Sequence, residues 1–320
     1  MDKHELQSAI EDVHAKYRSL ADGEVATYIP ELGKANPADF GIAAATVDGR
    51  MFEAGDCDRP FTIQSISKPF MFGMAIDELG HDRVRQHVGV EPSGDAFNSI
   101  ELQHGTNRPF NPMVNSGAIT VSALLHARYG DASLEHVLGC LSAAAGRRLE
   151  IDDAVFESER RTGHRNRAIA HLLLNFGMVH DQAEAALDLY FRQCSILVTC
   201  RDLAVMGASL ANMGQNPLTG ARVFDPGSVR HILSVMFTCG MYDYSGEWAY
   251  LVGVPAKSGV SGGVLSVVNR QLGISTYSPP LDAHGNSRRG IVALTELASR
   301  FGLHAFDCLN PGSSFLNVVL

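Results

Sequence analysis

A serine and a lysine stand three residues apart in an apolar segment, residues 61–70. On a helix this spacing puts Ser65 and Lys68 on one face, with about 5–6 Å between their Cβ atoms. A serine hydroxyl attacks a carbonyl group only when a base takes its proton, and lysine is such a base when burial lowers its pKa. Near a helix start, Ser65 would also present backbone N–H groups to an oxyanion. The pair indicates nucleophilic catalysis, although a cap beside a solvated lysine has the same spacing.

A second lysine precedes a hydroxyl residue and a glycine late in the chain. Lys257, Ser258 and Gly259 stand between two strand-like runs. They resemble the Lys-Thr/Ser-Gly element of penicillin-recognising serine enzymes, in which a backbone N–H of that strand completes the oxyanion hole. Alone, such a tripeptide is more often a glycine-rich turn. Together with the early Ser-x-x-Lys, and with helical segments in between, it follows the order that those enzymes use.

Several polar side chains of the middle and late chain could bind a small ligand. They are Asn115, Glu159, Asn166, Tyr190 and Tyr242. A carboxylate pairs with an ammonium group, whereas amides and phenols donate hydrogen bonds to a carboxylate. The set suits a site that holds a small molecule carrying both groups, although each residue by itself is more often structural.

The first elements that must hold these residues follow from apolar spacing and turn residues. A helical period covers 5–20. A β-hairpin is predicted over 40–47 and 50–54, where Asp48-Gly49 would supply the positive φ angles of a two-residue turn. This predicts that the N-terminal part contributes one helix and two strands.

The rest of the chain is first helical and then changes character. From about 65 to 220 the patterns are mostly helical, most clearly over 132–146, 181–193 and 201–213, the last capped by Thr199. Strand-like runs follow at 248–254, 263–268 and 272–277, and a helix is predicted over 289–301. This order predicts a sheet built from both ends of the chain, residues 1–64 and 221–320. A helical lobe, 65–220, would be inserted, with the active site in the cleft between the two.

Composition excludes several classes of protein. Of 320 residues, 45% are apolar and 19% charged, which is ordinary for a globular chain. The formal charge of −9 disfavours nucleic acid as a partner. No run is long and apolar enough to span a bilayer, and the charged first residues do not resemble an export signal, so we expect a cytoplasmic location. Neither the six cysteines nor the histidines show metal-ligand spacing, so no metal and no cofactor are predicted.

The chain resembles the serine-dependent glutaminases, in their compact bacterial form, over about residues 25 to 300. This family belongs to the β-lactamase-like superfamily. The matching stretches are 28–32, 61–68, 90–94 with 97–99, 111–118, Glu159 with 163–166, 239–243, 255–260 and 278–282. The resemblance implies an α/β (α+β) fold of the β-lactamase/transpeptidase type, mainly an antiparallel sheet flanked by helices with an inserted helical lobe. It also implies hydrolysis of L-glutamine to L-glutamate and ammonia by a homodimer or homotetramer.

The resemblance also assigns roles to individual residues. Ser65 would be the nucleophile, with Lys68 and Tyr242 as proton acceptors or relays, in an order that the sequence leaves open. Backbone N–H groups of Ser65 and Val260 would form the oxyanion hole. Substrate contacts would come from Ser65, Tyr242 and Val260. The side chains of the other substrate contacts are Tyr28, Asn115, Glu159, Asn166 and Tyr190.

Two other functions stay open at this point. A β-lactamase or D,D-peptidase would share Ser65, Lys68 and Lys257, but the export signal and the Ser-x-Asn loop of those enzymes are not found. A non-catalytic glutamine sensor would keep the pocket and lose the chemistry, yet all chemical positions are filled. The run 307–320 matches nothing in the family and has the composition of a linker before an apolar tail.

Overall fold

The computed structural model describes residues 3–94, 99–179 and 183–307, and its centre is a five-stranded antiparallel sheet. The strand order is β2-β1-β8-β7-β6. The strands are β1 (Gly41–Thr46), β2 (Met51–Gly55), β6 (Ala256–Ser258), β7 (Gly263–Val268) and β8 (Leu272–Tyr277). Because β1 pairs with β8, the two ends of the chain meet in one sheet. The predicted antiparallel sheet built from both ends is confirmed.

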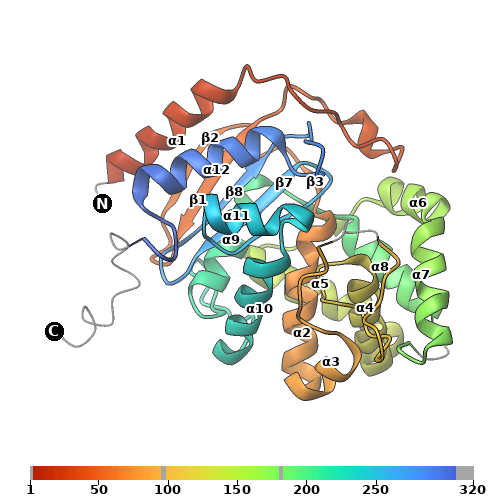
Figure 1. Ribbon diagram of the computed structural model, residues 1–320. Coiled ribbons are helices and arrows are strands. Elements are labelled where there is room, and N and C mark those ends of the chain that lie inside the picture. The colour runs from red at the N-terminus through yellow and green to blue at the C-terminus, as the bar shows by residue number, and fades with distance from the viewer. Residues whose placement is uncertain (1–2, 95–98, 180–182, 308–320) are drawn as a thin grey trace.

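Helices cover both faces of this sheet (Figure 1). Helices α1 (Lys3–Tyr17) and α12 (Arg288–Phe301) pack on one face, and α9 (Cys200–Ala211) packs on the other. Along β1, Ile42 and Ala44 belong to the apolar cluster that includes residues of α1 and α12. Ala43 and Ala45 belong to the cluster that includes residues of α9, as the two-residue period of a strand requires. The predicted helices at both ends are confirmed. So is the Thr199 cap, which forms a capping box with Asp202.

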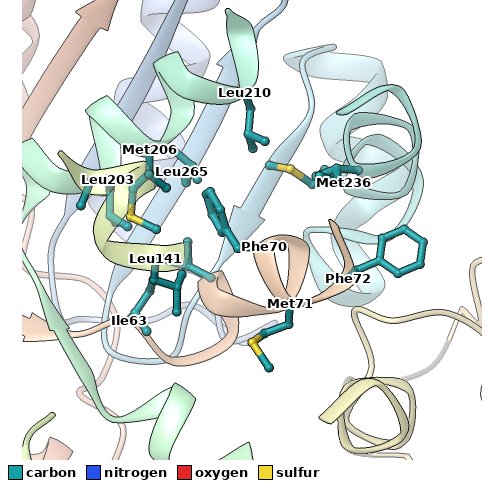
Figure 2. Packing of buried hydrophobic residues seen from close by; sticks show 14 of the residues in the cluster. Ile63, Phe70, Met71, Phe72, Leu141, Leu203, Met206, Leu210, Met236 and Leu265 are labelled. Carbon is teal, nitrogen blue, oxygen red and sulfur yellow. The ribbon is translucent and has the colours of Figure 1, made fainter. Parts of the chain in front are cut away.

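A group of helices surrounds α2 (Lys68–Leu79). Helix α2 packs against α4 (Asn115–Tyr129), α5 (Ser133–Ala145) and α10 (Pro226–Cys239). Figure 2 shows side chains of α2, α5, α9, α10 and β7 gathered in one buried cluster, with Phe70 extending from α2 toward Leu265. The remaining helices of this part are α3 (His81–His87), α6 (Asp153–Thr162), α7 (His164–Asn175) and α8 (Ala183–Cys194). Burial of α2 on several sides fixes the start of the helix, where Lys68 lies.

The helical part also contains a small sheet that the sequence patterns did not predict. Its order is β3-β5-β4, from β3 (Phe61–Thr62), β5 (Ile196–Val198) and β4 (Glu150–Ile151). Strands of two or three residues are too short to show a period. Short 3₁₀ helices lie at η1 (Leu32–Lys34), η2 (Gln64–Ser67), η3 (Gly130–Ala132) and η4 (Tyr242–Tyr244). The domain boundaries at 65 and 220 stay predictions.

Two local predictions were wrong. Residues 248–254 do not form a strand, because Ser245–Leu251 is helix α11. Its aromatic and aliphatic residues suit a strand, but Trp248 and Val252, four apart, are buried together while Tyr250 is 82% exposed. The turn after β1 is also longer than two residues. Only Gly49 has a positive φ, and its N–H bonds to the Thr46 carbonyl. This matches a type I turn followed by a left-handed glycine.

Two predicted segments lie partly outside the described residues. The start of the helix predicted over 181–193 and nearly all of the tail predicted over 307–320 lie outside the described residues. Cys57, Cys140, Cys194, Cys200 and Cys239 are free thiols. None of the helices in the described ranges combines the length and the apolar character needed to cross a bilayer.

Candidate active site

Ser65 lies on a sharp turn between a strand and a helix. Strand β3 pairs with β5, and the N–H of Ile63 donates to the Ile196 carbonyl at 2.8 Å, so the entry to the turn is fixed. Gln64 then takes a left-handed backbone, φ +49°, which is unfavourable for a residue with a Cβ. Helix η2 carries Ser65 and leads directly into α2. The turn therefore holds the Ser65 side chain, 6% exposed, at the edge of a cavity.

Lys68 is buried at the start of α2, and polar atoms surround its amine. Its Nζ lies 2.7 Å from Asn115 Oδ1 and 3.1 Å from the Met113 carbonyl. The Asn115 amide in turn donates to Asn166 Oδ1 at 3.0 Å. Burial lowers the pKa of Lys68 to about 8, while the negative potential of Cys194 and Glu159 opposes this shift. A lysine with such a pKa can act as a base near neutral pH.

Tyr242 reaches the same place from the far end of the chain. It begins η4 with φ +59°, a strained backbone for an aromatic residue. Its hydroxyl donates to the Ser258 carbonyl at 3.0 Å and is hydrogen-bonded to the Ser65 side chain. Burial raises the pKa of Tyr242, and its bonds to Ser65 and Ser258 oppose the rise. The fold thus joins the phenol and the serine hydroxyl.

Two backbone N–H groups are predicted to form an oxyanion hole. One belongs to Ser65, and the other belongs to Val260, two residues after the end of β6. Within the described residues neither N–H donates to a backbone carbonyl. Both residues line the cavity. A pair of N–H donors without backbone acceptors is what the predicted oxyanion hole requires.

The cavity has a volume of about 270 Å³. It is lined by all of the predicted substrate contacts except Tyr242: Tyr28, Ser65, Asn115, Glu159, Asn166, Tyr190 and Val260. Lys68 and Tyr242 stand behind this lining and hydrogen-bond to Asn115 and Ser65 respectively. The fold therefore brings the predicted site residues together around one space.

Glu159 is the acidic side chain of the lining. It lies near the end of α6, is 4% exposed, and its Oε2 has no hydrogen-bond partner among the described residues. Burial raises the pKa of Glu159 to about 8, whereas the Lys68 charge and a hydrogen bond from Gln64 oppose the rise. A buried carboxylate oxygen without a partner is costly unless a ligand supplies a donor.

Two tyrosines close the cavity. Tyr190, on α8, is buried, and burial raises its pKa. Tyr28 is 56% exposed as a residue and also lines the cavity, and burial raises its pKa as well. It therefore lies between the cavity and the protein surface. This arrangement suits a residue that covers a bound ligand.

Some lining residues were not singled out from the sequence. Gln64 donates to Thr62 Oγ1 at 3.2 Å and also hydrogen-bonds to Glu159. Thr162 and Arg165 line the cavity beside Glu159. Gln64 precedes the predicted nucleophile, which is the one signal that could have marked it. Its left-handed backbone, which aims the amide at Glu159, is visible only in the fold.

A larger groove of about 490 Å³ lies on the other side of Val260. Two pairs of its charged side chains form ion pairs, because Arg59 lies 3.1 Å from Asp39 and Lys34 lies 2.5 Å from Glu31, and its Asp152 caps helix α6. It does not contain Ser65 or Glu159. The smaller cavity is therefore the candidate active site.

Comparison with known proteins shows the family of the chain. The family model described as Glutaminase matches residues 23–306. The chain belongs to the glutaminase family. A glutaminase of Trichormus variabilis is 53% identical over 304 residues, which are 95% of this chain and 91% of the relative. This chain is accordingly an enzyme, a glutaminase.

Solved glutaminases have the same fold. The probable glutaminase ybaS superposes with a TM-score of 0.93 at 39% identity, covering 96% of this chain and 99% of that one. A probable glutaminase from Bacillus subtilis, complexed with 6-diazo-5-oxo-L-norleucine, gives a TM-score of 0.87 at 36% identity, with the same coverage. The predicted β-lactamase-like fold class is thereby confirmed.

Proposed function

We propose that this glutaminase hydrolyses L-glutamine to L-glutamate and ammonia through an acyl-enzyme on Ser65. The observation that carries the proposal is the contact between the Ser65 hydroxyl and the buried phenol of Tyr242 at the edge of the cavity. Attack by Ser65 Oγ on the side-chain amide carbon forms a tetrahedral intermediate. Its collapse breaks the C–N bond and releases ammonia, and water then cleaves the ester to give glutamate.

Two groups serve proton transfer in this proposal. Tyr242 is hydrogen-bonded to Ser65, so it can relay the proton over the shortest path. Lys68 has a pKa of about 8, so roughly a tenth of it is the neutral base at pH 7. The same groups return the proton to the departing ammonia. Either order of Lys68 and Tyr242 fits this geometry.

Backbone N–H groups stabilise the negative charge of the tetrahedral intermediate in this proposal. The N–H groups of Ser65 and Val260 donate to the former carbonyl oxygen in our proposal, and both are without backbone acceptors among the described residues. Losing one such donor typically costs about 3 kcal/mol of transition-state stabilisation. Because these donors are main-chain atoms, the fold around β6 and η2 sets their position.

Free glutamine is the substrate that best suits the lining. Glu159 offers a carboxylate oxygen without a partner for the α-ammonium group, and Asn166 and Tyr190 can donate to the α-carboxylate. A glutamine within a protein chain lacks both charges and would leave Glu159 unpaired. The Bacillus subtilis relative was solved with 6-diazo-5-oxo-L-norleucine, an amino acid, which supports this choice.

Ammonia release from L-glutamine tests the mechanism. We expect Ser65→Ala to abolish release, whereas Ser67→Ala should keep it, because the Ser67 hydroxyl is committed to the Gln64 carbonyl at 2.7 Å. Equal rates for wild type and Ser65→Ala would reject the acyl-enzyme. Turnover of nitrocefin would favour the β-lactamase alternative, and glutamine binding without ammonia release by wild type would favour a sensor.

The proposal includes a cytoplasmic homodimer or homotetramer whose cavity lies between the sheet and the helical lobe. These points rest on the family resemblance and on the sequence. Light scattering of the purified protein measures the assembled mass. A monomeric mass at micromolar concentration would overturn the oligomer.

A further inference from the structure

Lys257 is a fully buried lysine that the proposed mechanism does not use. It lies on β6 with 0% of its surface exposed. Its Nζ is 2.8 Å from the Gly240 carbonyl, 2.8 Å from the Ser258 carbonyl and 4.1 Å from the ring centroid of Tyr242. Burial, together with the charge of Lys68, lowers the pKa of Lys257. Even the neutral amine has two N–H groups, and the two carbonyl oxygens accept from them. Burial of this amine is therefore compensated at the Tyr242 turn.

The turn that carries Tyr242 needs such support. A left-handed backbone at a residue with a bulky side chain is strained and persists only when its surroundings fix it. The turn is pressed against β6, because a Cβ at Gly240 would lie 1.7 Å from the Ala256 carbonyl oxygen. The Gly240 carbonyl accepts from the Ser258 N–H at 3.3 Å as well as from Lys257. Lys257 thus links the turn that carries Tyr242 to strand β6 by a hydrogen bond.

The same amine also fixes the direction of the phenol. Lys257 and the Tyr242 hydroxyl donate to one acceptor, the Ser258 carbonyl, at 2.8 and 3.0 Å. With its proton directed at Ser258, the Tyr242 oxygen presents a lone pair to Ser65, to which it is hydrogen-bonded. Lys257 does not line the substrate cavity. The contacts of its amine that lead to the reacting groups are the Tyr242 ring and the Ser258 carbonyl that it shares with Tyr242.

We propose that Lys257 is a positioning residue that holds the Tyr242 phenol against the Ser65 hydroxyl. The inference rests on the proposed role of Tyr242 in proton transfer. Displacing a reacting group by about 1 Å can cost roughly a hundredfold in rate. Because the substrate contacts are elsewhere, loss of Lys257 changes kcat and leaves KM for glutamine nearly constant.

The test is a double-mutant cycle on ammonia release with Lys257→Met, Tyr242→Phe and the double variant. Methionine keeps the length and apolar contacts of the stem and removes the amine. We expect Lys257→Met to lower kcat about tenfold to a hundredfold, with KM within about twofold. In the Tyr242→Phe background the same change should alter kcat by less than about twofold. The control is Lys16→Met, because Lys16 is exposed and pairs with Glu296 on the opposite side of the sheet from α9.

Each outcome decides one of the two proposals. Full kcat in Tyr242→Phe would overturn the relay role of Tyr242 and with it this inference. If Tyr242→Phe lowers kcat while Lys257→Met keeps the wild-type kcat, the inference alone is overturned. The same holds if the losses in kcat of the two single variants are additive in the double variant. A large rise in KM would overturn the inference as well. L-Glutamate binding by calorimetry shows whether the site is folded. If Lys257→Met fails to bind, Lys257→Leu, which also lacks a hydrogen-bond donor, replaces it in the same cycle and is held to the same criterion.

Discussion

Replacing Glu159 with glutamine tests how the substrate's ammonium group is held. The change keeps the size of the side chain and removes its charge. Glu159 is buried, and its Oε2 has no partner within the described residues, so the bound ammonium group would complete its hydrogen bonds. Glu157, two residues earlier on α6, is partly exposed and pairs with Arg160 at 2.8 Å. Glu157→Gln is therefore a matched control.

The expected magnitude depends on pH. Removing one partner of a buried ion pair costs about 3 kcal/mol at the low end of the usual range, or roughly a hundredfold in affinity. The pKa of Glu159 in the free enzyme is about 8. At pH 7 only about a tenth of the carboxyl groups are ionised, so binding must remove a proton at a cost of about 1.4 kcal/mol. The loss in Glu159→Gln should therefore be about tenfold at pH 7 and near a hundredfold at pH 8.5.

Calorimetric titration with L-glutamine in a Ser65→Ala background measures this affinity without turnover. The parent should bind more tightly at pH 8.5 than at pH 7, because a carboxyl group with a raised pKa gains its charge in that interval. Glu159→Gln should lose this dependence, and Glu157→Gln should keep it. An affinity in Glu159→Gln within about threefold of the parent at pH 8.5 would refute the ion pair, because it corresponds to under 1 kcal/mol.

Two further predictions concern pH and packing. The kcat/KM of wild type should rise by up to about a hundredfold per unit between pH 6 and 7 and level off above about 8, because Lys68 and Glu159, each with a pKa of about 8, must both lose a proton; a flat initial-rate profile would contradict this. Gly117→Ala should lower the melting temperature, because a Cβ would lie 1.9 Å from the Asn111 carbonyl oxygen. Gly139→Ala, where nothing lies within 4 Å on helix α5, should instead stabilise by about 0.5–1 kcal/mol, and thermal unfolding compares the two.

Much of the fold could be predicted from local patterns. Helix α1, the hairpin β1–β2 and helix α12 follow from periods that burial of one face imposes, and the Thr199 cap follows from its hydroxyl. The strand predicted at 248–254 failed because aromatic composition outweighed the spacing of Trp248 and Val252. Strands β3 to β5 were missed because two or three residues carry no period, and only pairing with distant partners creates them.

Residue types indicated candidate chemical groups, a hydroxyl at 65, an amine at 68, a carboxylate at 159 and a phenol at 242, and the resemblance to the glutaminases assigned their roles. Each of these side-chain types takes part in only a few kinds of reaction, so candidate chemistry can be inferred before any contact is known. The spacing of Ser65 and Lys68 is local to one turn and was therefore readable in the chain. How far each pKa would shift was not readable, since burial by distant segments causes the shift.

Only the tertiary structure decided which groups touch. The hydrogen bond between Ser65 and Tyr242 depends on β1 pairing with β8, on β6 joining the same sheet, and on a left-handed turn at η4. The support of that turn by Lys257 likewise joins atoms from two separate segments. Such contacts are set by the sum of packing over the whole chain, which the order of residues specifies but no local pattern displays.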